Sequence, residues 1–289
     1  MCTMRRFAIA LMLLLPFATP SFAESTVITV GTDRPARVVL PEANPTMPQP
    51  LLLILHGYTS SGEYLDDYLN LRPEAAKRGM VLAFPNGTKE ANTGTPFWQG
   101  TDACCNFLNS PVDDVAYLVG LVDEIAAVTP IDRTRVYVFG HSNGSFMGYK
   151  LACTRPDVFA AVAGLAGATF AKRTDCKPSV PISILHIHGT ADQTIPINGT
   201  FLAAAVPSAA QTVKMWAGYN GCAAAKPMKR FRNIDINATV KGAETQVYSY
   251  NCPKGLNVDF WKSIGGVHSP KPNANFPVQL MGWLLKHQR

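Results

Sequence analysis

The chain has 289 residues, of which 47% are hydrophobic, and its 26 basic and 20 acidic side chains give a formal net charge of +6. This mild excess is not a nucleic-acid-binding footprint, because the basic residues are scattered along the chain. Their one local cluster is interpreted as a solvated loop or as a weak contact to anionic surfaces. It consists of Lys226, Lys229, Arg230 and Arg232. No apolar run reaches the roughly 20 residues that a membrane span needs, so no span is expected.

Residues 1–23 have the pattern of a secretory signal peptide. Arg5 and Arg6 are followed by the apolar stretch Phe7 to Phe17 and by Ser21-Phe22-Ala23, a small-x-small cleavage site. Removal of this segment takes away two arginines and no acid, which lowers the net charge to +4. We therefore expect a secreted protein, extracellular or periplasmic, in which residues 24–289 form a single domain. We expect this protein to be a monomer.

In chain order, the apolar residues predict strands that alternate with helices. The segments 26–30 and 36–40 are expected to form an antiparallel hairpin, and the unbroken apolar run Leu51 to Leu55 is typical of a buried parallel strand. Further strands are predicted at 80–84, 136–139, 159–165, 182–187, 245–250 and 258–263, and helices at 113–128, 143–153 and 276–287. This alternation favours a doubly wound α/β sheet.

The most informative motif is Gly140-His141-Ser142-Asn143-Gly144, between the strand at 136–139 and the helix that begins at 143. A strand, a G-x-S-x-G corner and a helix together form the nucleophile elbow of an α/β-hydrolase, in which the serine hydroxyl stands clear of the sheet. Gly140 and Gly144 suit such a corner because side chains there would clash. The less specific interpretation is a tight turn that contains a serine by chance. The motif predicts the α/β-hydrolase fold, a mostly parallel central sheet with helices on both faces.

The chain order of an α/β-hydrolase identifies the acid. These enzymes place nucleophile, acid and base in that order, each at the C-terminal end of a strand. Asp192 is the first acid after the strand at 182–187, in a turn-forming segment. Asp157 and Asp175 are competitors, but Asp157 precedes a strand and Asp175 lies in a charged loop. Asp192 is therefore predicted to be the catalytic acid.

The same order identifies the base. Of the six histidines, only His268 lies after Asp192 in a loop that follows a strand, where Gly265 and Gly266 free the loop to turn the imidazole toward Ser142. His287 lies at the end of a helix, and the remaining four precede Asp192. Those four are His56, His141, His186 and His188. We expect His186 and His188 to point to opposite faces of a strand and to be structural.

Two backbone N–H groups are expected to stabilise the oxyanion. One belongs to Asn143, directly after the serine, and the other to Tyr58, in the loop after the strand at 51–55, where Gly57 lets the backbone approach. Trp98 lies in a long polar loop, residues 85–110, that is expected to border the cleft. Its indole is interpreted either as part of a substrate rim or as a cover over the core.

The cysteines predict disulfides. Of seven, Cys2 lies in the signal segment, and an even count of six in an exported chain favours disulfides, although 15 pairings are possible. The expected pairs are Cys153 with Cys176, Cys222 with Cys252 and, by remainder, Cys104 with Cys105. A bond between adjacent cysteines would close a strained ring. No metal site is expected, because no second closely spaced Cys or His pair accompanies Cys104 and Cys105.

Together these features resemble the secreted polyhydroxybutyrate depolymerase and feruloyl/acetylxylan esterase-like family, of carbohydrate esterase family 1 type. The motifs that carry the resemblance are His56-Gly57, Trp98 with Cys104-Cys105, Val112-Asp113-Asp114-Val115, Arg135-Val136-Tyr137-Val138, Gly140-His141-Ser142-Asn143-Gly144, Phe159-Ala160-Ala161, His188-Gly189-Thr190-Ala191-Asp192 and Gly265-Gly266-Val267-His268. The resemblance implies ester hydrolysis by a Ser–Asp–His triad without a metal or organic cofactor. The chain departs from the family at Ser145 and Val267, where the family usually has glycine, and at Ser269-Pro270, where it has Trp-Pro.

The expected function is a secreted serine carboxylic-ester hydrolase that acts through an acyl-enzyme. Its expected substrates are polyesters of the polyhydroxybutyrate type or feruloyl and acetyl esters of plant cell walls, and no nucleic-acid partner is expected. Two other classes stay open. One is a serine peptidase of the prolyl-oligopeptidase type, and the other is a catalytically inactive hydrolase fold that serves as a binding protein.

Overall fold

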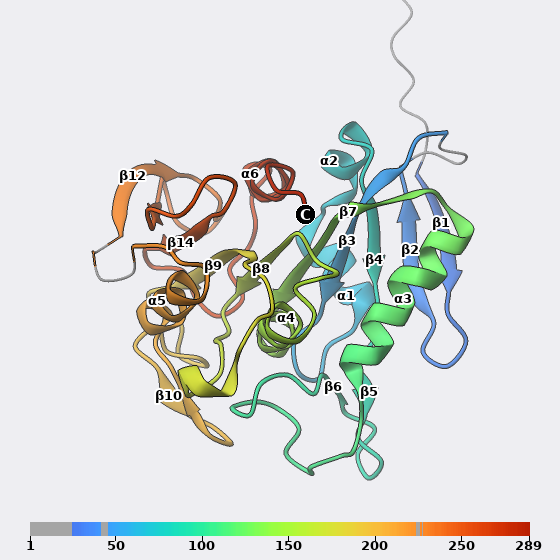
Figure 1. Ribbon diagram of the computed structural model, residues 1–289, viewed down its shortest axis with the longest axis horizontal. Coiled ribbons are helices and arrows are strands. Elements are labelled where there is room, and N and C mark those ends of the chain that lie inside the picture. Colours follow the sequence, from blue (N-terminus) through green and yellow to red (C-terminus); the bar gives the residue numbers. More distant parts are fainter. Residues whose placement is uncertain (1–24, 42–45, 224–225, 227) are drawn as a thin grey trace, which may run out of the picture.

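A ten-stranded sheet forms the centre of the computed structural model, which describes residues 25–41, 46–223, 226 and 228–289 (Figure 1). The expected signal peptide, residues 1–23, lies outside the described residues. In spatial order the strands are β1 (Thr26–Val30), β2 (Ala36–Leu40), β4 (Val81–Phe84), β3 (Gln49–Leu55), β7 (Ile131–His141), β8 (Ala161–Leu165), β9 (Ser183–Gly189), β14 (Val258–Ser263), β13 (Thr245–Ser249) and β12 (Lys229–Ile234).

The central strands of this sheet are parallel. β4, β3, β7, β8, β9 and β14 pair in parallel, whereas β1 and β2 at one end and β13 and β12 at the other pair antiparallel. All seven residues of β3 are buried, which explains its unbroken apolar sequence, because a parallel strand between two helical layers has no solvent-facing side. The expected hairpin of β1 and β2 is confirmed.

Helices cover both faces of the sheet, and the alternating side chains of β3 divide between them. Leu51, Leu53 and Leu55 lie in one core with α3 (Asp114–Val128), α4 (Asn143–Thr154) and α5 (Ala209–Tyr219). Leu52 and Ile54 lie in the other core with α1 (Gly62–Leu69), α2 (Arg72–Lys77) and α6 (Asn275–Leu284). Figure 1 shows α3 and α4 in front of the sheet. The predicted doubly wound α/β architecture is confirmed.

Several elements were not predicted from the sequence. Helices α1 and α5 begin at serine caps: the Ser61 hydroxyl accepts the Tyr64 N–H, and Ser208 and Gln211 form a capping box. α2 was also missed. The short strands β5 (Thr88–Lys89), β6 (Pro96–Phe97), β10 (Thr200–Phe201) and β11 (Ala205–Val206) form two small hairpins, and Arg173–Asp175 forms one turn of 3-10 helix.

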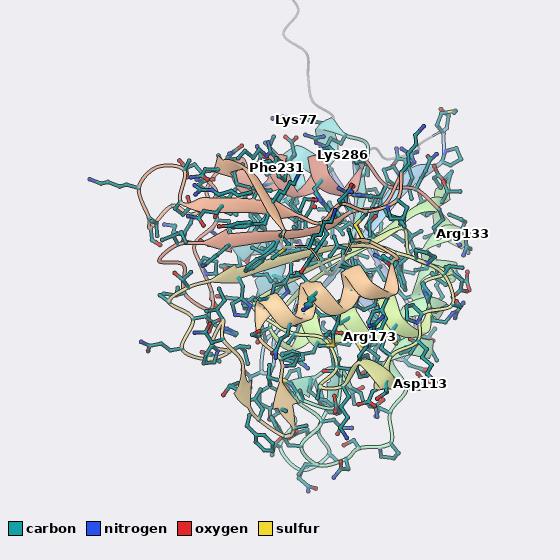
Figure 2. The ribbon with its side chains drawn as sticks, turned by 60° about the vertical axis from the view of Figure 1, so that its left-hand side comes forward. Lys77, Asp113, Arg133, Arg173, Phe231 and Lys286 are labelled. Carbon is teal, nitrogen blue, oxygen red and sulfur yellow. A yellow bond between two sulfur atoms is a disulfide. The ribbon has the colours of Figure 1, made fainter. Side chains whose placement is uncertain are left out.

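The basic cluster that was interpreted as a solvated loop lies largely in an edge strand. Lys229, Arg230 and Arg232 belong to β12, which pairs with β13 and exposes every residue except its last. Phe231, labelled in Figure 2, is 59% exposed on the same strand. Lysine and arginine are suited to an edge strand because their charge discourages pairing with another chain. The loop interpretation was wrong. A strand that is exposed on both faces lacks the alternation of apolar and polar residues by which strands are predicted from sequence.

Two long-range disulfides fasten the periphery of the sheet. Cys153 near the end of α4 is bonded to Cys176 just after the 3-10 turn, and Cys222 after α5 is bonded to Cys252 after β13. The adjacent Cys104 and Cys105 form the third disulfide. These are the three pairs expected from the sequence. None of the helices in the described ranges combines the length and apolar character that a bilayer span requires.

Candidate active site

Three side chains from separate loops meet at the C-terminal edge of the parallel strands. Ser142 follows β7, Asp192 follows β9 and His268 follows β14. The His268 Nε2 atom lies 2.9 Å from the Ser142 Oγ, and its Nδ1 atom lies 2.9 Å from the Asp192 Oδ2. Because a carboxylate can only accept, the Nδ1–H donates to Asp192 and Nε2 accepts the serine O–H. The structure thus brings the three residues selected by chain order into one hydrogen-bonded series.

Ser142 occupies a backbone conformation that side chains rarely adopt. Its φ of 53° and ψ of −120° place the residue at the tip of the turn between β7 and α4. A side-chain carbon at Gly140 would overlap the Gly144 carbonyl, and one at Gly144 would overlap the Leu55 carbonyl. The two glycines therefore let strand and helix approach closely enough to form the corner. The Ser142 N–H donates to the Leu165 carbonyl at 2.8 Å, which ties the corner to the neighbouring strand.

Asp192 is buried and accepts hydrogen bonds at both carboxylate oxygens. Oδ1 accepts the backbone N–H groups of Thr194 and Ile195, each at 2.9 Å, and Oδ2 faces His268 at 2.9 Å and the His188 Nε2 at 3.3 Å. Burial alone would raise the pKa of Asp192, but the bonds from His188, His268 and the Ile195 amide outweigh it and lower that pKa well below its usual range. The carboxylate is therefore ionised and fixed in orientation at neutral pH.

The loop that carries His268 is held from two sides. His141 donates its Nε2–H to the His268 carbonyl at 3.1 Å, and the two rings lie 5.3 Å apart. On the other side, the Ala191 N–H donates to the Gly266 carbonyl at 2.9 Å. A side-chain carbon at Gly189 would overlap the Gly266 backbone, so the acid and base loops are in direct contact. Burial is the main reason that the pKa of His141 is lowered to about 4, so this ring is neutral at pH 7.

The loop after β3 brings a second backbone segment against the serine. A side-chain carbon at Gly57 would lie only 3.3 Å from the Ser142 Cβ, so only glycine lets the chain pass this closely without displacement. Tyr58 is the next residue. Within the described part of the chain, the N–H groups of Tyr58 and Asn143 have no backbone or side-chain acceptor. Both expected oxyanion donors are therefore uncommitted amides beside the serine.

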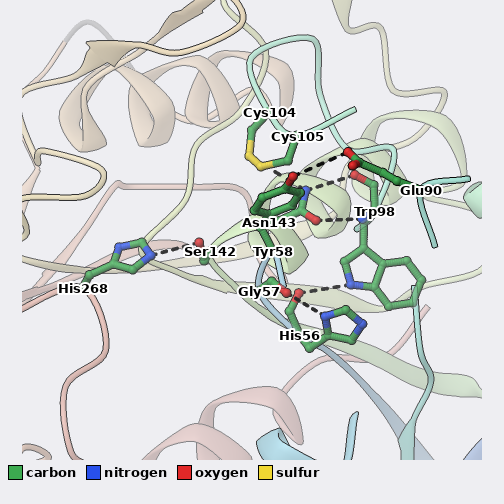
Figure 3. Close-up of a disulfide and its surroundings, with 10 residues drawn as sticks. All are labelled: His56, Gly57, Tyr58, Glu90, Trp98, Cys104, Cys105, Ser142, Asn143 and His268. Atoms are coloured by element: carbon green, nitrogen blue, oxygen red, sulfur yellow. Dashed lines mark hydrogen bonds between the residues drawn. A yellow bond between two sulfur atoms is a disulfide. The ribbon is translucent and has the colours of Figure 1, made fainter. Parts of the chain in front are cut away.

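Asn143 also has a side-chain role that was not anticipated. Its Oδ1 accepts the Trp98 N–H at 2.7 Å and its Nδ2 donates to the Trp98 carbonyl at 3.0 Å, so the fully buried amide replaces a strand partner for this loop (Figure 3). The same Nδ2 lies 3.9 Å from the Cys104 Sγ. Figure 3 shows the Cys104–Cys105 disulfide on one side of Asn143 and Trp98 on the other. The residue after the serine thus fastens the loop at 98–105 to the nucleophile corner.

Trp98 is not part of a substrate rim. Its side chain is fully buried, and its Nε1–H donates to the His56 carbonyl at 3.1 Å. The His56 ring lies 5.2 Å away and accepts the Gly87 N–H at its Nε2. The polar end of the indole is therefore used inside the protein, and the alternative interpretation, a cover over the core, is the correct one. The exposed apolar residues of this loop are Phe107 and Leu108, at 47% and 51% exposure.

The expected arrangement of His186 and His188 was wrong. Both side chains lie on the same face of β9, with ring centres 5.2 Å apart and the His186 Nε2 3.1 Å from the His188 Nδ1. Residues two apart in a strand share a face because successive side chains alternate. His188 reaches Asp192, so it belongs to the surroundings of the site. This contact follows from strand alternation and could have been predicted from the sequence.

Asp114 is a further residue that reasoning from the sequence did not identify as part of the site's support. Its carboxylate is fully buried at the start of α3, pairs with Arg34 at 2.6 Å and accepts the Gln99 N–H at 2.7 Å. It therefore anchors the loop that follows Trp98. A carboxylate in the first turn of a helix is common because it interacts favourably with the helix dipole, and this local explanation hides the long-range role of Asp114.

Comparisons with known proteins identify the family of this chain. A family model described as phospholipase/carboxylesterase matches residues 36–234, a region that includes Ser142 and Asp192 and ends before His268. The NocK protein of Nocardia uniformis subsp. tsuyamanensis is 31% identical over 186 residues, 64% of this chain and 52% of NocK. Feruloyl esterase B of Piromyces equi is 27% identical over 250 residues, 81% of this chain and 41% of that protein. The chain thus spans about half or less of the length of these two relatives.

A solved structure supports the fold. Acetyl xylan esterase from Aspergillus awamori superposes with a TM-score of 0.62 at 16% identity, covering 90% of this chain and 99% of that one. At that identity the likeness concerns the fold alone. The family model covers more than half of the sequence and includes the strand–serine–helix corner described above. The chain belongs to the phospholipase/carboxylesterase family.

Proposed function

We propose that this chain is a secreted serine carboxylic-ester hydrolase in which Ser142 is the nucleophile, His268 the general base and Asp192 the residue that orients the base. The observation that carries this proposal is the series from the Ser142 hydroxyl through both ring nitrogens of His268 to an ionised, buried Asp192. A serine is a weak nucleophile by itself, and a hydrogen-bonded imidazole activates it by accepting its proton.

The reaction would proceed in two acyl-transfer steps. His268 accepts the Ser142 proton at Nε2 as Oγ attacks the ester carbonyl, and Asp192 stabilises the imidazolium through Nδ1–H. The tetrahedral intermediate then collapses, and the alcohol leaves with the proton held at Nε2. Water, deprotonated by the same nitrogen, attacks the acyl-enzyme and releases the acid. In each step the His268 Nε2 first accepts a proton and then gives it to the departing oxygen, which in the second step is the Ser142 Oγ. This nitrogen must therefore be unprotonated at the start, and the Nδ1–H tautomer provides that state.

The uncommitted amides of Tyr58 and Asn143 are proposed to bind the oxyanion. Their N–H groups sit beside Ser142, and the Gly57 approach keeps the first of them close. Because backbone donors are fixed before the charge develops, they need no reorganisation in the transition state. Removal of one such donor in comparable enzymes costs about 3 kcal/mol of transition-state stabilisation.

For the substrate, we propose feruloyl or related aryl esters of plant cell walls, with acetyl esters second. Phe107 is about half exposed and packs edge-on against Tyr58 at 5.6 Å, next to the proposed oxyanion donor. An aromatic edge at this place can pack against an aromatic acyl group. The Piromyces equi relative is named as a feruloyl esterase, which supports the same class. An exported enzyme with disulfides would meet such polymers outside the cell.

The nucleophile is tested with Ser142→Ala and a matched control, Ser145→Ala. Ser145 lies in the helix that follows Ser142, and its buried hydroxyl has no hydrogen-bond partner among the residues that the structure describes, so its removal is expected to leave activity intact. Ser142→Ala is expected to abolish p-nitrophenyl butyrate hydrolysis and labelling by a fluorophosphonate probe while the urea unfolding midpoint stays near that of the unaltered chain. Substantial turnover by folded Ser142→Ala would overturn the assignment.

The substrate class is tested by comparing rates on methyl ferulate, acetylated xylan and polyhydroxybutyrate films. We expect methyl ferulate to be preferred, and a preference for the polyester would overturn the substrate proposal while leaving the mechanism. Cleavage of proline-containing peptides without ester turnover would indicate a peptidase instead. A protein that neither turns over esters nor reacts with the probe would be a binding protein.

A further inference from the structure

A buried series of polar side chains lies behind Asp192 and has no part in the acyl-transfer steps. The Tyr149 hydroxyl is 2.6 Å from the His186 Nδ1, the His186 Nε2 is 3.1 Å from the His188 Nδ1, and the His188 Nε2 is 2.8 Å from the Ile195 carbonyl and 3.3 Å from the Asp192 Oδ2. Tyr149, His186 and His188 are at most 1% exposed. We call these three residues the histidine series.

The proton positions in the histidine series follow from its ends. The Ile195 carbonyl can only accept, so the His188 Nε2 carries a proton. A neutral His188 then accepts at Nδ1 from the His186 Nε2–H, and a neutral His186 accepts at Nδ1 from the Tyr149 O–H. In this arrangement every donor and acceptor has a partner. Each residue donates to the next one along the series, from Tyr149 through His186 to His188, which lies beside the Asp192 carboxylate.

Burial keeps two members of the histidine series, His186 and Tyr149, neutral. It lowers the pKa of His186 well below its usual value, with the neighbouring His188 adding to the effect, and it raises the pKa of Tyr149 well above its usual value. A protonated His186 would have to donate at both ring nitrogens, which would leave the Tyr149 proton without an acceptor. Over the neutral pH range His186 therefore accepts the Tyr149 proton at Nδ1 and donates from Nε2 toward His188.

The histidine series connects the helix that follows Ser142 to the strand that leads into Asp192. Tyr149 stands two turns beyond Ser142 on α4, and its ring packs against Trp216 with the centres 6.0 Å apart. His186 and His188 belong to β9, which leads into Asp192. The His188 Nε2–H, whose shorter contact is to the Ile195 carbonyl at 2.8 Å, also lies 3.3 Å from the Asp192 Oδ2 that the His268 Nδ1–H contacts at 2.9 Å. It thereby restricts rotation of the same oxygen on which the base depends.

We propose that Tyr149, His186 and His188 are positioning residues that hold the Asp192 carboxylate in the orientation required by His268. This inference rests on the proposed function, because it concerns how the same triad is kept aligned. The hydroxyl of Tyr149 fixes the tautomer of His186, which fixes that of His188, which supplies the donor to Oδ2. Loss of the hydroxyl frees both rings to change tautomer and removes a constraint on the acid.

The test is Tyr149→Phe, with Tyr137→Phe as the matched control. Both tyrosines are fully buried, and within the described ranges each hydroxyl makes a single hydrogen bond. That of Tyr137 donates to the His287 carbonyl at 2.7 Å and does not involve the histidine series. Both variants keep the aromatic ring, so both are expected to fold with a similar small decrease in the urea midpoint. Only Tyr149→Phe is expected to lower kcat, by roughly three- to tenfold with KM unchanged, because alignment affects the transition state and not substrate binding.

The rate of fluorophosphonate labelling separates the possible outcomes, since it reports the reactivity of the serine without a leaving alcohol or deacylation. It is expected to fall in Tyr149→Phe by the same factor as kcat and to stay constant in Tyr137→Phe. Equal kcat and equal labelling rates in the two variants, with the unaltered chain active, would overturn the histidine series and leave the proposed function standing. An unaltered chain without labelling or ester turnover would overturn the proposed function itself.

Discussion

The stability of this protein is expected to depend on pH through buried histidines, and His287 gives the cleanest test. The ring is buried after α6, its Nε2 lies 3.0 Å from the Asn257 Oδ1, and its Nδ1 has no hydrogen-bond partner in the described part of the chain. Burial is the main reason that the pKa of His287 is lowered from 6.5 to about 4. In the described part of the chain the hydrogen bonds of His287 involve none of Ser142, Asp192 and His268, so its replacement is expected to report on stability.

The sign and size of the effect follow from proton linkage. Because the folded-state pKa is lower, the unfolded chain binds more protons between pH 6.5 and 4, so this contribution to the free energy of unfolding is present above pH 6.5 and is lost as the pH falls toward 4. With those two values, His287 contributes about 2 kcal/mol less at pH 5 than at pH 7. The difference between the free energies of unfolding at pH 7 and pH 5 should therefore be about 2 kcal/mol smaller in His287→Gln than in the unaltered chain.

Urea unfolding at pH 7 and pH 5 measures this difference directly. The matched control is Asn257→Ala, which removes the same hydrogen bond but keeps the titrating ring, so it should be less stable at both pH values and retain the full difference between them. An unchanged difference between pH 7 and pH 5 in His287→Gln would refute the reasoning. A reduced difference in Asn257→Ala equal to that in His287→Gln would assign the effect to the hydrogen bond and not to the proton.

Two other substitutions test the support of the nucleophile corner. Asn143→Ala leaves the buried N–H and carbonyl of Trp98 without their side-chain partner, so urea unfolding should show a decrease of about 2–4 kcal/mol in the free energy of unfolding. A decrease below about 0.5 kcal/mol would contradict a stabilising role for these two hydrogen bonds. Gly144→Ala places a methyl group against the Leu55 carbonyl and should cost about 1–3 kcal/mol through displaced backbone. Gly120→Ala, at a helical glycine with open space, should not destabilise the fold.

The core strands were predictable because they are buried on both faces. β3 and β4 are buried along their full lengths, and such strands appear in a sequence as continuous apolar runs. Helices α1 and α2 were missed because they are short, with eight and six residues. Each has too few apolar residues to show a clear helical period. β12 is hydrophilic along most of its length, so only its pairing with β13 reveals it.

The three residues of the proposed triad could be selected from the sequence because chain order and strand ends leave few candidates. The contacts that support it are of a different kind. Asn143 and Trp98 are 45 residues apart, and nothing in either local sequence indicates that an amide will bind that backbone. The role of His188 was within reach, because its spacing from Asp192 and from His186 is local, and it was lost through an incorrect assignment of strand faces.

The contact between Gly189 and Gly266 has a consequence for engineering new specificity into this scaffold. Because no atom beyond the backbone fits between the two turns, the segments at 189–192 and 265–268 can be transplanted only as a matched pair. A donor loop with a residue larger than glycine at position 189 would push the two turns apart, however well it suited the new substrate. Sequence variation is better introduced around Phe107 and Leu108, because these side chains are about half exposed to solvent and can change size without separating the two turns.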